Sequence, residues 1–460
     1  MDEDCIMRIV IIGGGKVGFA IAAQLTIEGH DITVVDKLRS LTDKISDQLD
    51  CMAVCGSGAS VDVMREAGVD DCDLMIACTA QDELNILCCV FARKLGCRST
   101  IARVRSPEYA RQMYLLKDQP GLSTIINPEQ NAAQEMFRLL EIPGVLKRDS
   151  FARGRVEIVE VIPKPGDPLD GTRLMDLPKK IRCKALVVAV QRGDQTFIPD
   201  GRFTLVVGDK VYLCAPATEI VRLLRSIGEY RKKARDILIL GGSRVAEYLT
   251  AMLVQADANV KLIEGDPERA EHFAELFPSA TVVCADAGSE AVLKEERAER
   301  MEAVAALSER DEENLILSMY AATLGVPQLL TMTDKAELAS LVTDQRNRLI
   351  SPKQLCADTI VRYVRAMQNT SGSSVVMMHH LAGGKVDALE FNVSRSCRNL
   401  GKTLMQIRLK PNILIASINR KGKIIVPGGA DTLESGDTVV VITGSNRVIL
   451  DLNDIFADAE

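Results

Sequence analysis

The first residues with a chemical signature are three closely spaced glycines near the start of the chain. Gly13, Gly15 and Gly18 follow a run of four apolar residues and open a stretch with helical spacing. In this pattern the first glycine permits a tight turn, the second lets a pyrophosphate approach the backbone, and the third allows close packing of helix on strand. The amino terminus of the helix supplies N–H donors and partial positive charge. The pattern therefore indicates a nucleotide-binding loop.

An acidic residue follows the glycines at the sequence spacing that is typical of a nucleotide-binding loop. Asp36 ends the second apolar run, 36 − 18 = 18 residues after Gly18. Its carboxylate can accept hydrogen bonds from ribose hydroxyls, and it disfavours a 2′-phosphate, so we expect NAD(H) rather than NADP. The alternative is a Rossmann domain that has kept the glycine-rich turn without a ligand.

The chain repeats itself after about half of its length. The segment 8–17 recurs as 236–245, and Glu264 takes the place of Asp36, both at an offset of 228. In the second copy Ser243 and Ala246 replace the second and third glycines, so this copy resembles a degenerate nucleotide site. Lys16 and its counterpart Arg244 begin the two predicted helices, where each is either a phosphate partner or a solvated cation.

The elements that position these residues follow from the hydrophobic pattern. Residues 7–127 alternate short Val- and Ile-rich runs with helix-length segments, which is typical of a parallel sheet covered on both faces. Residues 156–213 contain shorter strands separated by Pro, Gly and Asp turns, as in a small α+β domain. Because the pattern recurs, the predicted fold class is α/β, with two Rossmann-like domains, each followed by a small α+β domain.

Composition excludes several classes of protein. The 460 residues carry 56 Lys and Arg against 63 Asp and Glu, a net charge of −7 that offers no basic surplus for nucleic acid. No apolar run is long enough to span a membrane, and the first seven residues lack the basic region of a signal peptide, so we expect a cytoplasmic protein without direct membrane insertion. The 13 cysteines have irregular spacing and are expected to be reduced, with no metal site.

Catalysis has few candidates among the histidines. The chain has four, His30, His272, His379 and His380, and residues 143–228 have none to serve as a proton donor beside a nicotinamide. Lysines and carboxylates remain open as alternatives. We therefore expect no catalytic residue and no enzyme activity, with an NAD-dependent oxidoreductase as the alternative. A thiol redox sensor built on Cys88 and Cys89 is a third hypothesis.

Beyond the glycine motif, the whole chain after residue 7 resembles the TrkA family, the cytosolic subunits of Trk potassium-uptake systems. The resemblance rests on the tandem arrangement, the 8–18 loop with Asp36, and the segments 55–60, 79–85, 102–109 and 126–129. It implies alternating RCK-N and RCK-C domains (regulators of potassium conductance). The implied ranges are RCK-N at 7–127, a crossover helix or linker at 128–142, RCK-C at 143–228, a degenerate RCK-N at 233–352, a second crossover helix or linker at 353–371, and RCK-C at 372–458.

The resemblance also assigns the binding residues. In the first copy the implied nucleotide contacts are Gly13, Gly14, Gly15, Lys16, Val17, Gly18, Asp36, Ser57, Thr79, Ala80 and Arg103. In the second copy they are Gly241, Gly242, Ser243, Arg244, Val245, Glu264, Asp286, Leu307 and Ser308. Ser57 departs from the acidic or amide residue common at its position. At an offset of 228, the position of Arg103 is taken by Thr331, which removes a phosphate partner.

The implied function is regulation of transport without chemistry on the ligand. Family members bind NAD(H) and adenine nucleotides, here ATP or ADP, and assemble as a homo-oligomeric ring on the cytoplasmic face of a membrane potassium-translocating subunit of the TrkH/TrkG kind. Within this resemblance, the apolar stripe Ala133, Met136, Phe137 and Leu140 is either ordinary core or a crossover helix at a subunit contact.

Overall fold

The computed structural model describes residues 6–106, 109, 124–141, 148–152, 154–181, 183–228, 233–335, 342, 344, 346–370, 375–382, 385–444, 449 and 451–457. The chain divides into two compact units, each assembled from two stretches of sequence. The first unit comprises Met1–Glu141 and Lys233–Tyr363, and the second comprises Ile142–Lys232 and Val364–Glu460. The described helices include none that is long and apolar enough to cross a membrane.

The first unit contains two parallel sheets with the same strand order. The first sheet has the order β3-β2-β1-β4-β5-β6. Its strands are β1 (Arg8–Ile12), β2 (Asp31–Asp36), β3 (Met52–Cys55), β4 (Leu74–Ala77), β5 (Ser99–Arg103) and β6 (Thr124–Ile126). The second sheet has the order β14-β13-β12-β15-β16-β17. Its strands are β12 (Asp236–Leu240), β13 (Asn259–Glu264), β14 (Thr281–Cys284), β15 (Ala303–Ala306), β16 (Gln328–Met332) and β17 (Asn347–Ile350).

This strand order is that of the Rossmann fold, in which ligands bind at the carboxyl ends of the strands, where the strand order reverses. In each sheet that point lies between the first and fourth strands, directly after β1 or β12. The prediction of two Rossmann-like domains is therefore confirmed.

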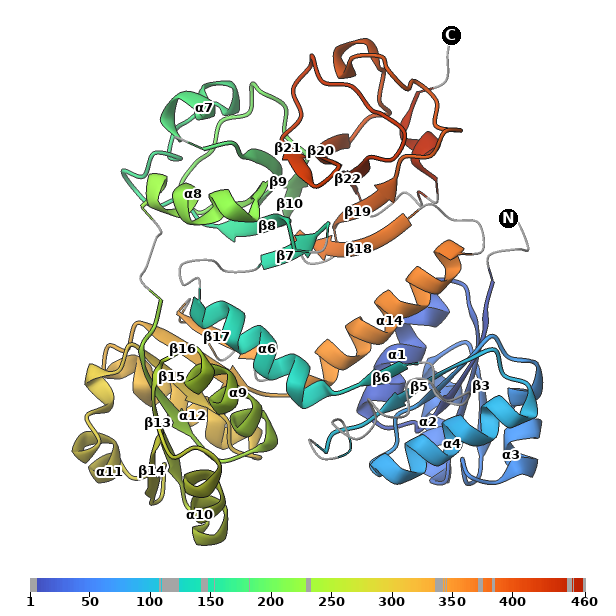
Figure 1. Cartoon of the computed structure of the whole chain (residues 1–460), viewed down its shortest axis with the longest axis vertical. Helices are drawn as coiled ribbons and strands as arrows, with labels where there is room; N and C mark the ends of the chain where they lie inside the picture. The colour runs from blue at the N-terminus through green and yellow to red at the C-terminus, as the bar shows by residue number, and fades with distance from the viewer. Residues whose placement is uncertain are drawn as a thin grey trace. The chain divides into compact units, whose positions relative to one another are not determined.

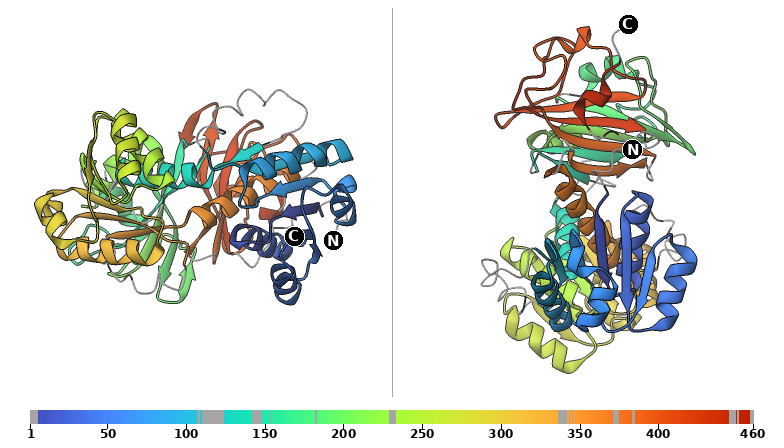
Figure 2. Two further views of the ribbon diagram at one scale, coloured as in Figure 1. Left: turned by 90° about the horizontal axis from the view of Figure 1, so that it is seen from below. Right: turned by 90° about the vertical axis from the view of Figure 1, so that its right-hand side faces the viewer.

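Helices cover both faces of each sheet, as the continuous apolar strands require. In β1 the four residues Ile9–Ile12 are all at most 2% exposed, so neither face of the strand meets water. In sequence, the helices that follow the strands of the first sheet are α1 (Lys16–Ile27), α2 (Arg39–Gln48), α3 (Val61–Glu66) and α4 (Asp82–Leu95), with α6 (Pro128–Glu141) after the last strand. Those of the second are α9 (Arg244–Gln255), α10 (Pro267–Leu276), α11 (Glu290–Glu295), α12 (Asp311–Thr323) and α14 (Pro352–Thr370). Figure 1 labels these elements, and the right-hand view of Figure 2 shows helices on both sides of the blue strands.

Helix α6 follows the first sheet in sequence but packs in the core of the second domain. Its buried residues Ala132, Ala133, Met136 and Leu140 share one hydrophobic cluster with the α9 residue Leu249 and its neighbours. Asn127, just before α6, also donates from Nδ2 to the Tyr248 hydroxyl at 2.9 Å. The apolar stripe expected in this segment is therefore a core contact between the two Rossmann domains of one chain.

The second unit holds two antiparallel sheets, which agrees with the predicted α+β domains. One has the order β10-β9-β11-β8-β7 and the other β18-β19-β22-β20-β21. The strands of the first are β7 (Arg148–Phe151), β8 (Val156–Val161), β9 (Leu186–Arg192), β10 (Gln195–Phe197) and β11 (Lys210–Pro216), with helices α7 (Leu177–Lys180) and α8 (Ile220–Ser226). Those of the second are β18 (Val375–Leu381), β19 (Val386–Asn392), β20 (Ile413–Arg420), β21 (Lys423–Ile425) and β22 (Thr438–Gly444).

Candidate functional site

The glycine-rich loop joins β1 to α1, and two of its glycines have no substitute. Gly13 has a φ of +109°, and a Cβ there would lie 3.0 Å from the backbone of Cys78 and Thr79. A Cβ on Gly18 would lie only 1.8 Å from the Gly13 carbonyl oxygen. The turn at Gly13 and the close packing at Gly18 are thus the roles that the sequence pattern predicts.

Gly15 has a different role, because the space beside it is empty of protein. It is the N-cap residue of α1, and no side chain caps the helix. A Cβ built on it would have no heavy atom within 4 Å. The first N–H groups of α1 therefore face open space, where the positive end of the helix dipole attracts an anion. Lys16, the first helical residue, is exposed beside them.

Asp36 is held at this loop by two backbone hydrogen bonds. Its Oδ2 accepts from the Gly14 N–H at 2.7 Å, and its Oδ1 accepts from the Leu38 N–H at 2.9 Å. An ionised carboxylate has about four acceptor positions, so two remain for ribose hydroxyls. The carboxylate is only partly buried, and its orientation is fixed before any ligand binds.

Asn85 connects the carboxyl ends of β4 and β5, although it is not among the nucleotide contacts expected from the sequence. Its Oδ1 accepts from the Thr79 N–H at 2.8 Å, and its Nδ2 donates to the Arg103 carbonyl at 2.9 Å. The side chain is fully buried, so it holds the ends of β4 and β5 together. The sequence repeat could have identified this residue, because an asparagine, Asn314, occupies the matching position of the second copy. Its Oδ1 accepts from the Ser308 N–H, and its Nδ2 donates to the Met332 carbonyl.

A half-buried carboxylate, Glu129, lies near arginines of both Rossmann domains. Burial raises its pKa, while the positive charges of Arg103, Arg105 and Arg244 act to lower it. Its Oε2 and the Arg103 Nε are buried without a hydrogen-bond partner among the described residues. Arg103 is 9% exposed. Arg103 and Arg105 of the first domain and Arg244 of the second thus bring positive charge to one place, beside this carboxylate.

The other expected residues of the first copy differ in exposure. Ser57 and Ala80 are exposed, and Thr79 is half-buried at the end of β4. Val17 is buried beneath the loop at 3% exposure, so only its backbone can meet a ligand.

In the second loop, which joins β12 to α9, the polar groups hydrogen-bond to one another. The Ser243 side chain caps α9 by accepting from the Ala246 N–H at 3.4 Å. Glu264 is 5% exposed, and its Oε2 accepts from the Gly242 N–H. Its Oε1 accepts from the Asp266 N–H at 2.8 Å and pairs with Arg269 at 3.2 Å. The donors and acceptors that remain open in the first loop are therefore largely used in the second.

Strand pairing corrects the residue-by-residue alignment of the two copies. In the first sheet Ala77 pairs with Ala102, and in the second Ala306 pairs with Thr331. Thr331 therefore corresponds to Ala102, and the counterpart of Arg103 is Met332. The expectation that Thr331 matches Arg103 was wrong by one residue, although a phosphate partner is still missing.

Strand pairing thus changes the offset between the two copies from 228 to 306 − 77 = 229 residues in this part of the chain, and the new offset places the remaining second-copy residues. Ser308 corresponds to Thr79, since its N–H donates to Asn314 at 2.7 Å. Leu307 then corresponds to Cys78 and is fully buried. Asp286, at the position of Ser57, is exposed and accepts from the Gly288 N–H at 2.8 Å.

The described histidines do not form a catalytic group at the first loop. His30 is buried beside the start of β2, where its Nδ1 accepts from the Met7 N–H at 3.3 Å. His379 lies in the second unit, where its Nδ1 is 3.1 Å from Asp149 Oδ1. His272 is exposed on α10. Among the residues that the structure describes, no three His, Cys, Asp or Glu side chains are grouped as metal ligands.

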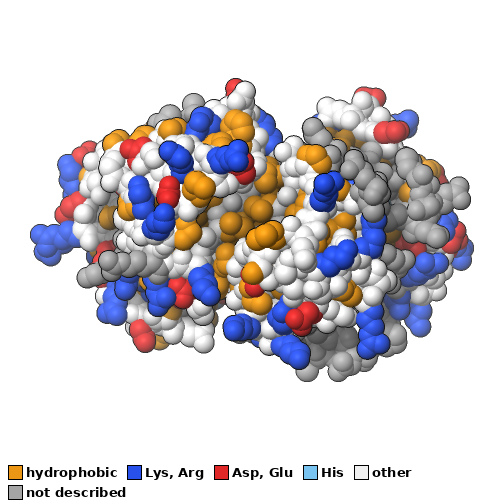
Figure 3. All heavy atoms as spheres, turned by 90° about the horizontal axis from the view of Figure 1, so that it is seen from above, with side chains coloured by type: hydrophobic (Ala, Val, Ile, Leu, Met, Phe, Trp, Pro, Cys, Tyr) orange, Lys and Arg blue, Asp and Glu red, His pale blue; other side chains and the backbone are white. Residues whose placement is uncertain are grey.

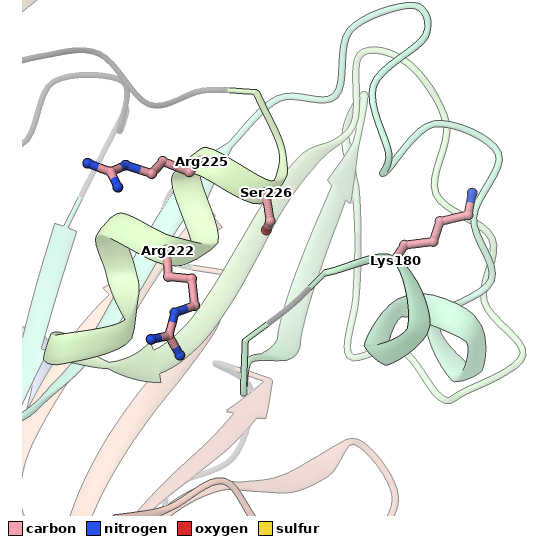
Figure 4. A pocket seen from close by; sticks show the side chains of 4 residues that line it. All are labelled: Lys180, Arg222, Arg225 and Ser226. Carbon is pink, nitrogen blue, oxygen red and sulfur yellow. The ribbon is translucent and has the colours of Figure 1, made fainter.

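A cavity of about 320 Å³ lies in the second unit, lined by Lys180, Arg222, Arg225 and Ser226. Figure 4 shows that its three basic side chains point in different directions, and Arg222 is already paired with Glu219 at 3.0 Å. These charges do not converge on one anion. On the face drawn in Figure 3, Lys and Arg side chains are scattered without forming one continuous patch.

Comparison with known proteins agrees with this arrangement. The TrkA-N domain model matches residues 9–128 and 237–352, and the TrkA-C domain model matches residues 158–228 and 388–456. A Trk system potassium uptake protein TrkA homolog of Archaeoglobus fulgidus is 30% identical over 95% of this chain and 97% of its own. The Trk system potassium uptake protein TrkA of Halomonas elongata is 30% identical over 98% of each chain.

Among solved structures, the GsuK channel bound to NAD has a TM-score of 0.61 at 17% identity and covers 97% of this chain and 78% of its own. The GsuK RCK domain gives 0.61 at 18% identity over 97% and 94%. At this identity the likeness concerns the fold. The sequence matches, which extend over both Rossmann domains and both antiparallel domains, establish that the chain belongs to the TrkA family.

Proposed function

We propose that the chain is a regulatory subunit of a Trk-type potassium-uptake system and that it binds NAD(H) in its first Rossmann domain. The observation that carries this proposal is the uncapped N-terminus of α1 at Gly15, beside the carboxylate of Asp36. The names of the relatives support the potassium-uptake role, and the NAD-bound form of a channel with the same fold supports the ligand.

The nucleotide in this proposal is bound mainly by backbone groups. The pyrophosphate lies over the N–H groups after Gly15, the ribose hydroxyls donate to Asp36, and Arg103 adds positive charge near the phosphates. Ser57 lies on the adenine side, with Thr79 and Ala80 along the wall. ATP and ADP share the phosphate and ribose chemistry, so we propose that they compete for the same cleft.

The second loop is a second candidate site of lower affinity. Its proposed contacts are Gly241, Gly242, Ser243, Arg244, Val245, Glu264, Asp286, Leu307 and Ser308. A ligand there has to displace the Ser243 cap and compete with the ion pair between Glu264 and Arg269, whereas Gly15 leaves the first helix without a side-chain cap. The difference favours binding in the first domain.

Regulation follows if nucleotides bind two conformations of the protein unequally. A ligand shifts an equilibrium only by its difference in affinity between the two states. We propose that NAD(H) and adenine nucleotides differ in this way, and that the shift gates a membrane potassium-translocating subunit of the TrkH/TrkG kind. The chain then acts in the cytoplasm, at the inner face of the membrane, and changes no bond of its ligand.

Exposed apolar side chains recur on α4 and α12 and support self-association. Leu87 and Val90 are 42% and 40% exposed, and their counterparts Ile316 and Met319 are 67% and 49% exposed. The same helix face is thus apolar in both copies, and we propose that these faces join copies of the chain into a ring.

Two measurements test the proposal. Titration of the purified chain with NADH is expected to show saturable binding, with the nicotinamide absorbance unchanged over time. Affinity purification from detergent-solubilised membranes is expected to recover a polytopic potassium transporter. Turnover of the cofactor with a small substrate would instead favour an oxidoreductase, and recovery of no potassium transporter would contradict the regulatory role.

A further inference from the structure

Two cysteine thiols of the first Rossmann domain lie in contact at the amino-terminal edge of its sheet, opposite the glycine-rich loop. The Sγ of Cys72 lies 3.2 Å from the Sγ of Cys97, and the Cys72 thiol donates to the Cys97 sulfur. Both side chains are buried, at 2% and 1% exposure. The two thiols are therefore shielded from solvent, and only a small reagent can reach them.

The backbone around the pair suits a covalent bond between the two sulfurs. The Arg98 N–H donates to the Cys72 carbonyl at 3.3 Å, and Leu74 pairs with Ser99 two residues further on. Neighbouring strands lie about 4.8 Å apart, which falls within the range of about 4.4–6.8 Å that disulfides span between Cα atoms. Bond formation therefore needs the sulfurs to approach by about 1 Å and leaves the strands in place.

Cys97 differs from the other buried thiols in its electrostatic surroundings. The hydrogen bond from the Cys72 thiol is the largest cause of a lowered pKa at Cys97, and the positive charge of Arg93 adds to it. Arg93 Nη1 lies close by, donating to the Cys97 carbonyl at 2.9 Å. In contrast, burial raises the pKa of Cys88 to about 12. Since the thiolate is the nucleophilic form of cysteine, Cys97 is the reactive member of the pair.

The second Rossmann domain builds the same sheet without these thiols. At the offset of 229, Met301 takes the place of Cys72 and Val326 takes the place of Cys97. The packing at this edge therefore does not require cysteine, and the dithiol is a property of the first domain alone.

We propose that Cys72 and Cys97 form an oxidation site at which hydrogen peroxide converts the two thiols into a disulfide. The Cys97 thiolate attacks one peroxide oxygen, the O–O bond breaks, and the hydroxide that leaves takes up the proton lost by Cys97. The Cys72 sulfur then attacks the resulting sulfenic acid, an S–S bond forms as the S–O bond breaks, and a second water leaves with the Cys72 proton. Two thiols and one peroxide thus give one disulfide and two waters, independently of any nucleotide.

A peptide map of the full-length protein tests this assignment. Trypsin releases Cys97 alone in residues 95–98, and it releases Cys72 in residues 66–93 together with Cys78, Cys88 and Cys89. After treatment with hydrogen peroxide, denaturation and alkylation, we expect loss of the alkylated 95–98 peptide and gain of its cross-link to 66–93. Dithiothreitol should restore the alkylated peptide.

Variants identify the partner sulfur. Cys88→Ala should leave the cross-link intact, and Cys72→Ala should abolish it. Full recovery of the alkylated 95–98 peptide from the treated wild-type protein would overturn the proposal, whether or not the variants fold. A cross-link that persists in Cys72→Ala would likewise overturn it, because another thiol would then be the partner.

Discussion

Replacement of Gly15 by valine separates ligand binding from folding. The backbone at Gly15 has φ −67° and ψ −172°, which any residue adopts, and a Cβ there meets no protein atom within 4 Å. The valine side chain instead fills the space above the first N–H groups of α1, where the phosphates are proposed to lie. Loss of about two charge-assisted hydrogen bonds, each worth about 1.5–3 kcal/mol, is expected to weaken NADH binding by about two to four orders of magnitude.

Calorimetric titration with NADH measures this loss, and urea unfolding checks the fold. Valine is a poorer N-cap than glycine, but it also restricts the unfolded chain, so the free energy of unfolding should change by less than about 1 kcal/mol. Ser243→Val is the matched variant in the second domain. It removes a side-chain cap, costs about 1 kcal/mol, and should leave the main NADH affinity unchanged. Unaltered NADH affinity in Gly15→Val would refute the site assignment, and an unfolded variant would refute the open space beside the loop.

Three further substitutions test other parts of the structure. Asp36→Ala should weaken NADH binding more than NADPH binding, because the carboxylate that repels a 2′-phosphate is gone; an unchanged ratio of the two dissociation constants would contradict its ribose role. Gly18→Ala places a Cβ 1.8 Å from the Gly13 carbonyl oxygen and should destabilise the protein by about 1–3 kcal/mol in urea unfolding; an unaltered midpoint would disprove the close packing. Leu87→Asp should reduce the mass measured by light scattering, since it charges an exposed apolar face of α4, while Lys94→Ala on the same helix should not; equal masses would exclude this face from self-association.

The strands and the loop were predictable because their determinants are local. Apolar runs such as Ile9–Ile12 are long enough to reveal buried parallel strands, and the Gly13–Gly18 spacing encodes a turn that only glycine permits. Asp36 was predictable for the same reason, because the spacing places it at the end of the neighbouring strand. The fold and the core of the site thus follow from short stretches of sequence.

The features that sequence reasoning missed depend on contacts between distant residues. One extra residue lies between Glu264 and Cys284 compared with Asp36 and Cys55, and only strand pairing shows that Met332 therefore replaces Arg103. The apolar stripe of α6 indicated a packed face but not its partner. The self-capped second loop likewise required the positions of Ser243 and Glu264, since their residue types alone suit binding as well as capping.

The packing of α6 on α9 has a consequence for the order in which the chain is made. Met136 and Leu249 belong to one cluster but lie 249 − 136 = 113 residues apart in sequence. At about 5–20 residues per second, a ribosome needs roughly 6–23 s to synthesise the partner of a helix that has already emerged. During that interval the apolar face of α6 is unprotected, which makes the nascent first half a candidate client for chaperones. A fragment that ends between the two copies would keep this face exposed permanently.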